Sequence, residues 1–181
     1  MTRAELEHVI RAAADIAVDD EIIVIGSQAI LAQFPDAPAA LRVSVEADVF
    51  PKNHPERADL IDGSIGEGSP FHAAYGYYAQ GVSETTAVLP AGWKDRLVPV
   101  CNANTRGSTA WCLEVHDLVL SKAFAGRDKD SAFIKEAVAH GLVDEAILVD
   151  RLAALPVPAR DRERLRELLV AWFRAAPRTV G

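Results

Sequence analysis

The period of the hydrophobic pattern changes near residue 114, and this change limits the folds open to the chain. Before it, apolar residues form short β-branched runs, such as "IIVIG" (22–26) and "LRVSVEADVF" (41–50). After it, they recur at helical spacing. We therefore expect an α/β core in residues 1–114, with a mixed sheet flanked by helices, and a helical subdomain in residues 115–181 packed on that core.

Turn residues and periodicity predict the elements within these two parts. The helices are expected at 2–17, 27–34, 55–61, 143–154 and 159–175, with further helical pattern from Val115 to about Val138, and the strands at 22–26, 41–50 and within 85–90, 96–101 and 108–114. The glycine- and aromatic-rich stretch 62–83 is expected to be a long connection, of a length that is often functional.

The composition limits the class of protein. The chain has 181 residues, a formal net charge of −7 and two cysteines, Cys101 and Cys112, which form no CxxC pair. A disulfide framework and a structural zinc site are not expected. The N-terminal residues read as a charged helix and no apolar run is long enough to span a bilayer, so we expect a cytoplasmic protein with no membrane partner. The acidic balance gives no support for binding nucleic acid by charge alone.

Two carboxylates, Glu46 and Asp48, stand two residues apart in the second apolar run. Side chains at i and i+2 of a strand point to the same face, so the two acids are expected side by side. A hard divalent cation such as Mg2+ relieves their repulsion and leaves room for substrate phosphates. The alternative is an edge strand whose solvent face carries both acids.

Two further groups suit phosphate binding. Gly26 and Ser27 end the first strand and open a helix, where backbone N–H groups and the hydroxyl can approach phosphate oxygens. Lys122 falls on the apolar side of a predicted helix, and Arg127 follows in a charged turn. The structural alternatives are an ordinary strand-to-helix turn, a lysine that extends to solvent, and Asp128 or Asp130 as a helix cap.

The order of these elements resembles the minimal nucleotidyltransferase fold of the polymerase-beta-like superfamily. Within that superfamily the chain is similar to the AbiEii/MenT type of toxin and abortive-infection nucleotidyltransferases. The matching stretches are "IVIGSQAIL", "VEADVFP", "SPFHAAYGYYAQGVS", "LPAGWKDRLV" and "LEVHDLVLSKAFAGRDKD", which together cover roughly residues 22 to 135.

The resemblance implies a magnesium-dependent enzyme that transfers a nucleoside monophosphate from an NTP to an RNA acceptor, with the tRNA 3′ end as the expected target. Such an enzyme releases pyrophosphate, blocks translation and is restrained by a cognate antitoxin protein. By the same resemblance, Gly26 and Ser27 would hold the triphosphate and Glu46 and Asp48 would bind magnesium.

The resemblance also assigns roles in the helical half. Lys122 and Arg127 would contact phosphates. Lys122 would also be a catalytic residue, and so would the metal ligand Asp48. Asp130 would be a catalytic or orienting acid.

The chain departs from the family pattern at two places. Glu46 stands where an aspartate is usual, and the expected third strand, "TTAVLP", carries no carboxylate where a third metal ligand often occurs. Asp95 and Asp130 are possible substitutes. Two alternative functions stay open: a nucleotidyltransferase that modifies a protein partner, and a non-catalytic module that binds nucleotide or antitoxin.

Overall fold

The computed structural model describes residues 1–176, and the chain divides into two compact units. The first unit comprises residues 1–87 and 96–114. The second comprises residues 88–95 and, of the described part of the chain, residues 115–176. The short segment 88–95 thus belongs with the helical part, although it lies within the α/β half of the sequence.

A five-stranded mixed sheet forms the centre of the first unit, in the order β3-β2-β1-β5-β4. Its strands are β1 (Glu21–Val24), β2 (Glu46–Pro51), β3 (Tyr78–Gly81), β4 (Val98–Val100) and β5 (Thr109–Cys112). β1 pairs antiparallel with β2 and parallel with β5, β2 pairs parallel with β3, and β4 pairs antiparallel with β5. The mixed sheet flanked by helices that the sequence predicts is confirmed.

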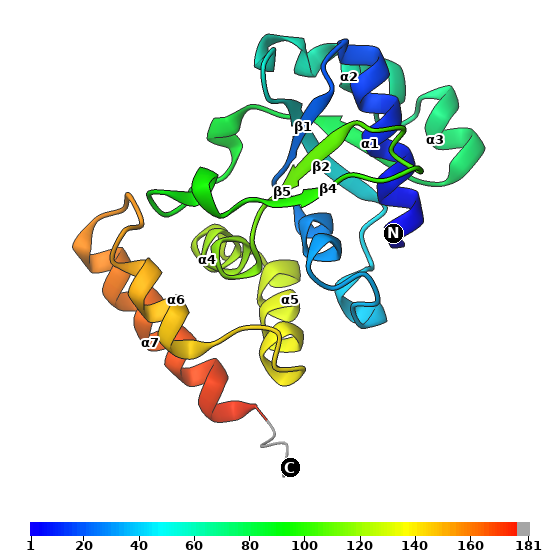
Figure 1. Cartoon of the computed structure of the whole chain (residues 1–181). Coiled ribbons are helices and arrows are strands. Elements are labelled where there is room, and N and C mark those ends of the chain that lie inside the picture. The colour runs from blue at the N-terminus through cyan, green and yellow to red at the C-terminus, as the bar shows by residue number, and fades with distance from the viewer. Residues whose placement is uncertain (177–181) are drawn as a thin grey trace. The chain divides into compact units, whose positions relative to one another are not determined.

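Helices α1 (Arg3–Ala17) and α2 (Ala58–Ile65) pack against each other and against β2 and β3 (Figure 1). α1 begins with a capping box, in which Thr2 accepts from the backbone N–H of Glu5 and the Glu5 side chain accepts from that of Thr2. Its buried stripe includes Leu6, Val9, Ile10 and Ala13. The short helix α3 (Pro70–Tyr75) lies just before β3 and begins at Ser69, which caps it.

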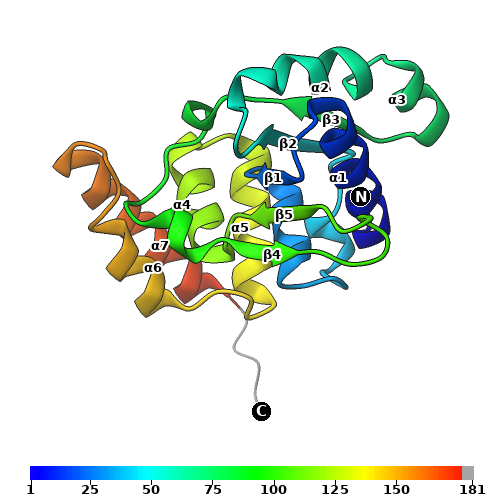
Figure 2. The same cartoon turned by 45° about the horizontal axis from the view of Figure 1, so that its top comes forward.

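Four helices make up most of the second unit: α4 (Val115–Ala125), α5 (Asp128–Ala139), α6 (Glu145–Leu152) and α7 (Ala159–Ala175). α4 packs on α5 and α6, and α6 and α7 run side by side (Figure 2). A polar contact joins two of them: Nη1 of Arg151 on α6 donates to Oδ1 of the fully buried Asp117 on α4 at 3.1 Å. No helix among residues 1–176 has the length and apolar character needed to cross a membrane.

Several predicted elements differ from the structure. The segment 27–34 is a 3₁₀ helix, η1 (Ser27–Ala32), and the second strand begins at Glu46 rather than residue 41. The predicted strand in "TTAVLP" is wrong. Ser83 accepts a hydrogen bond from the backbone N–H of Thr85 and begins a 3₁₀ turn there instead.

The third strand in chain order is Tyr78–Gly81, inside the stretch expected to be a long connection, which also contains α3. The remaining elements, η2 (Ala39–Leu41), η3 (Pro55–Arg57), η4 (Glu84–Thr86) and η5 (Trp93–Arg96), are 3₁₀ turns.

Candidate active site

Glu46 and Asp48 lie on an interior strand, because β2 has β3 on one side and β1 on the other. Both side chains are partly buried, and they alternate with the fully buried Ala47 and Val49. The two carboxylates therefore share one face of the sheet, as predicted. The edge-strand alternative is wrong, so the pair needs another explanation than a solvated strand face.

Asp48 lies directly against the backbone of Gly26. A Cβ atom built on Gly26 would stand 1.8 Å from Oδ2 of Asp48, far inside any allowed contact. The backbone N–H of Ile25 donates to the carbonyl of Asp48 at 3.1 Å, which fixes the end of β1 beside β2. Because glycine has no Cβ atom, the carboxylate of Asp48 can lie against the turn that follows β1.

Glu46 is held by the neighbouring strand. The hydroxyl of Tyr78 on β3 donates to Oε2 of Glu46 at 3.3 Å. Burial, together with the negative charges of Glu46, Glu67 and Asp48, raises the pKa of Tyr78 to about 12. The Tyr78 hydroxyl therefore stays protonated well above neutral pH and can donate to the Glu46 carboxylate.

Gln80 occupies the position beside Asp48. The register of the parallel pair places Tyr78 next to Glu46 and Gln80 next to Asp48, and Gln80 is exposed. Side chains two apart on β3 share a face, so the amide of Gln80 lies on the carboxylate side. The residue at the place where a third acid would complete the group is an amide.

No three His, Cys, Asp or Glu side chains among residues 1–176 are grouped so that they could hold a metal ion. Asp95, one expected substitute for a third ligand, is exposed in the 3₁₀ turn η5 of the second unit. Asp130, the other, is paired with two cationic side chains in the same unit. Glu46 and Asp48 thus form a two-carboxylate group.

Gly26 and Ser27 lie at the start of η1, which is a 3₁₀ helix of six residues. Its anchor is Gln28, which is fully buried and donates from Nε2 to the carbonyl of Ser44 at 2.8 Å. Ser44 in turn accepts from the backbone N–H of Glu46 through its hydroxyl at 3.1 Å. This chain of contacts links the turn to the start of the acidic strand.

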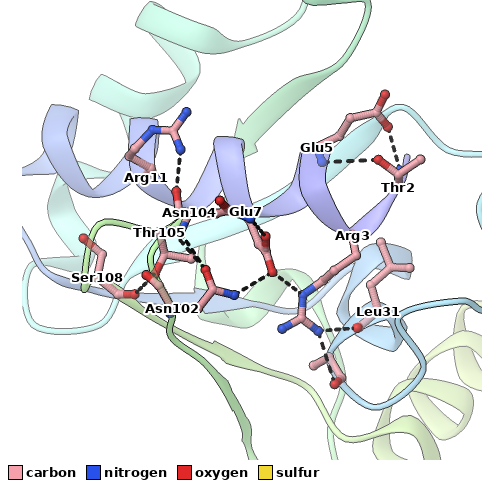
Figure 3. A network of polar contacts seen from close by, with 11 residues as sticks. Thr2, Arg3, Glu5, Glu7, Arg11, Leu31, Asn102, Asn104, Thr105 and Ser108 are labelled. Atoms are coloured by element: carbon pink, nitrogen blue, oxygen red, sulfur yellow. Dashed lines mark hydrogen bonds and ion pairs between the residues drawn. The ribbon is translucent and has the colours of Figure 1, made fainter.

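A polar network centred on Glu7 holds the other end of η1 (Figure 3). Glu7 is 5% exposed and accepts from Nε of Arg3 at 2.9 Å and from the side-chain amides of Asn102 and Asn104 at 2.8 Å each. Burial alone would raise the pKa of Glu7, but these hydrogen bonds outweigh it and lower the pKa. Arg3 then donates to the carbonyl of Leu31, at 2.6 Å, near the end of η1.

Lys122, Arg127 and Asp130 form a group of their own in the second unit. Asp130 is completely buried and accepts from Nζ of Lys122 at 3.0 Å and from Nε of Arg127 at 2.6 Å. Burial would raise the pKa of Asp130, but the hydrogen bonds and charges of Arg127 and Lys122 outweigh it and lower the pKa. An ionised Asp130 with both oxygens engaged is suited to orient the two cations rather than to transfer a proton.

The two cations differ in exposure. The Lys122 side chain is 8% exposed and its Nζ lies 4.6 Å from the ring centroid of Phe133, whereas the Arg127 side chain is 59% exposed. Arg127 itself is the N-cap residue of α5, with no side-chain cap. The structural alternative in which Asp128 or Asp130 caps this helix is therefore wrong, and Asp130 forms the ion pairs instead.

Sequence reasoning missed Tyr78, Gln80, Gln28 and the Glu7 network. The only local signal was the spacing of Arg3 and Glu7, which are four apart on one helix face. Tyr78 and Gln80 become visible only once their strand is paired with β2.

The side chains at Glu46 and Asp48 fit a magnesium ion. The two carboxylates, with the side-chain carbonyl of Gln80 on the adjacent strand, supply the oxygen ligands that hard cations prefer. Magnesium sites commonly use one or two carboxylates and complete the shell with water and substrate phosphates. The carboxylates of Glu46 and Asp48 are therefore enough protein ligands for a site of this type.

The chain has a strand followed by Gly-Ser and a short helix, then an antiparallel strand with two acids on one face and a third strand parallel to it. This mixed α/β arrangement is a nucleotidyltransferase-like fold. The chain belongs to the family described as "Nucleotidyltransferase of unknown function (DUF6036)", whose model matches residues 4–179. No curated protein and no solved structure matches the chain.

Proposed function

We propose that this chain is a magnesium-dependent nucleotidyltransferase that transfers a nucleoside monophosphate from an NTP to an RNA acceptor, with the tRNA 3′ end as the target. The observation that carries the proposal is the contact between Asp48 and Gly26, with Glu46 on the same face of β2. It puts a carboxylate against a turn whose backbone can approach a triphosphate. Family membership supports the reaction class.

Five residues of the first unit have roles in this proposal. Glu46 and Asp48 bind the metal, and Tyr78 holds the Glu46 carboxylate in place. Ser27 and the backbone at Gly26 hold the triphosphate. Magnesium, when bound, supplies positive charge to the phosphates and to the attacking hydroxyl. The acceptor hydroxyl gives its proton to water and its oxygen bonds to the α-phosphorus. The bond from that phosphorus to the oxygen shared with the β-phosphate breaks, and pyrophosphate leaves with that oxygen and the bonding electrons.

Lys122 and Arg127 keep the role that the resemblance implies, contact with phosphate oxygens. Asp130 orients both side chains through its hydrogen bonds. Catalysis of this kind rests on positioning and on charge stabilisation rather than on a covalent intermediate.

We further propose, from the resemblance to the AbiEii/MenT type, that the reaction blocks translation and makes the chain the toxin of a toxin–antitoxin pair. A cognate antitoxin protein is then its partner. Growth arrest on expression, abolished by Asp48→Asn, is the corresponding cellular result; normal growth with active enzyme would separate the reaction from this role.

The enzymatic test incubates the protein with Mg2+ and each α-labelled NTP, with and without total tRNA. We expect label on tRNA, reduced about 100-fold or more in the Glu46→Gln, Asp48→Asn double variant. Asp59→Asn, an exposed acid on α2 of the same unit, is the matched control and should retain activity. Label on protein instead of RNA would support a protein-modifying enzyme.

One observation favours a second function. The residue beside Asp48 is the amide Gln80, and no third acid joins Glu46 and Asp48 in a metal-binding group among residues 1–176. In that case the chain is a non-catalytic module that binds nucleotide or antitoxin without turnover. Nucleotide binding that is independent of magnesium, with no pyrophosphate released under any condition, would establish this alternative.

A further inference from the structure

Four aromatic rings gather on the first unit, from α1, α3 and the residue before β3. His8 lies 5.0 Å from Phe71, 4.7 Å from Tyr75 and 6.0 Å from Tyr77, measured between ring centroids. Tyr75 and Tyr77 stack at 5.9 Å with an interplanar angle of 30°. Nδ1 of His8 and the hydroxyl of Tyr77 are 2.8 Å apart and share a hydrogen bond. We call these four residues the aromatic cluster.

The cluster is not a closed core. Tyr75 is 53% exposed although three other rings contact it, and His8, Phe71 and Tyr77 are all partly exposed. A hydrophobic core would cover such rings, since an aromatic side chain loses much of its burial energy when it stays half in water. The arrangement leaves ring surface available to a planar ligand.

Positive charge stands beside the cluster in a chain whose net charge is −7. Arg11 follows His8 by three residues on α1, so the two side chains lie on one face of that helix. Burial lowers the pKa of His8, and the charges of Arg11 and Arg106 lower it further. Arg106 has 71% of its side chain exposed and a loose contact, 3.8 Å, with Asp15. Arg11 donates to the carbonyl of Asn104, so its position is fixed.

The cluster is connected to the candidate active site through α3. On that helix Phe71 and Tyr75 belong to the cluster, while the ring of His72 lies 4.7 Å from the ring of Tyr78. Tyr78 in turn donates to Glu46. A strand of nucleic acid held at the cluster would therefore be near residues that contact the acidic pair.

We propose that the aromatic cluster, with Arg11 and Arg106, is a binding surface for the unpaired bases of a single-stranded RNA. Tyr75 stacks on a base and the two arginines contact neighbouring phosphates, the combination used where single strands are held without sequence readout. This inference rests on the proposed function, because it supplies the surface that holds the acceptor.

The test measures fluorescence anisotropy of a fluorescein-labelled, mixed-sequence single-stranded RNA oligonucleotide with the full chain, without NTP or magnesium. Tyr75→Ala should weaken binding about 10-fold, and Tyr75→Phe, which keeps the ring, should bind like the natural chain. Leu60→Ala removes another side chain that is 53% exposed, on α2, and is the matched control. Arg106→Gln should weaken binding and lower its salt dependence, whereas Arg164→Gln, an exposed arginine of α7, should not.

The result separates this inference from the proposed function. RNA affinity unchanged in Tyr75→Ala and Arg106→Gln would overturn the surface, even if nucleotide transfer is found. Binding lost in both variants, with no transfer under any condition, would retain the surface and reject the enzyme. Transfer to a protein acceptor with no RNA binding would overturn the surface and identify the partner as protein. Circular dichroism of each variant checks that the chain is folded.

Discussion

Tyr78 donates a hydrogen bond to Glu46 from the strand next to it, across 3.3 Å, and two residues further on Gln80 stands beside Asp48 in the same register. The acidic pair on β2 is therefore matched, residue for residue, by a hydroxyl and an amide on β3. This pairing allows the two positions on β3, Tyr78 and Gln80, to be tested separately from the acids on β2.

Gly26→Ala should disable the candidate active site, because the new Cβ would meet Oδ2 of Asp48 at 1.8 Å. Either Asp48 or the backbone of the turn must move, and we expect a loss of about 1–3 kcal/mol in the free energy of unfolding. Thermal unfolding and NTP binding in the presence of Mg2+ measure the two effects.

Gly63→Ala is the matched control for this substitution. Gly63 lies within α2, and a Cβ atom placed on it would meet nothing within 4 Å from other parts of the chain among residues 1–176. Alanine there should therefore stabilise the chain by up to about 1 kcal/mol. Equal effects of the two substitutions would contradict the role given to Gly26.

Gln80→Glu should strengthen metal binding, since it adds a third carboxylate beside Asp48. Without metal the added charge should lower the melting temperature, and Mg2+ should restore it at a concentration about 10-fold lower than the natural chain requires. Calorimetric titration with Mg2+ gives the affinities. Gln80→Met keeps the length without charge, and the same Mg2+ response in both variants would rule out a metal at this position.

Tyr78→Phe should change the dependence of stability on pH in strong base. The pKa of Tyr78 is raised to about 12, whereas the unfolded chain ionises it near pH 10, so the native state retains more protons between these values. Stability of the natural chain should therefore fall as pH rises through this window, and that contribution should be absent in the variant.

Base-induced unfolding of the two proteins, followed from pH 9 to about pH 12, measures the difference. Near neutral pH the variant should lose about 1 kcal/mol with the hydrogen bond to Glu46. Parallel pH curves for the two proteins would show that burial and the neighbouring acids do not raise the pKa of Tyr78.

Asp130→Asn should destabilise the second unit by about 3 kcal/mol, because it removes the carboxylate charge that pairs with the buried ammonium of Lys122. The lowered pKa of Asp130 gives the sign of the pH effect: its contribution is present above the ordinary value of 3.8 and is lost as pH falls through the lowered pKa. Urea unfolding at neutral and acid pH measures both.

Asp128→Asn, in the same first turn of α5 but exposed, is the control for Asp130→Asn and should change stability by less than about 1 kcal/mol. The double change Lys122→Met, Asp130→Leu removes both buried charges and should recover stability relative to Asp130→Asn alone. No recovery would mean that the ion pair is not what Asp130→Asn disturbs.

The acidic pair could be predicted from sequence because its geometry is local. Side chains two residues apart on a strand lie on one face, whatever the strand pairs with. The Gly-Ser turn after β1 is also a local feature of the sequence. The helices of the second part could be predicted for the same reason, since their apolar residues recur within a few turns.

β3 could not be predicted, because "YAQG" contains a glycine and a glutamine and has no β-branched residue. It is a strand only because β2, more than two dozen residues earlier, offers it a parallel partner. "TTAVLP" has the opposite character, with β-branched residues that favour a strand, but a serine side chain bonds to the local backbone and begins a turn. In the first case long-range strand pairing outweighs the intrinsic β propensity of the residues, and in the second a local side-chain hydrogen bond does.

The position of β1 between β2 and β5 has a consequence for how the chain is made. β2 follows β1 closely, but the parallel partner on its other side, Thr109–Cys112, is synthesised only after most of the first unit. Until then the hydrophobic strand Glu21–Val24 has one open edge on the ribosome-bound chain, an edge that can pair with another molecule. Translation that stalls between β4 and β5 would therefore release a fragment prone to aggregate, and the sheet closes only when its fifth strand emerges.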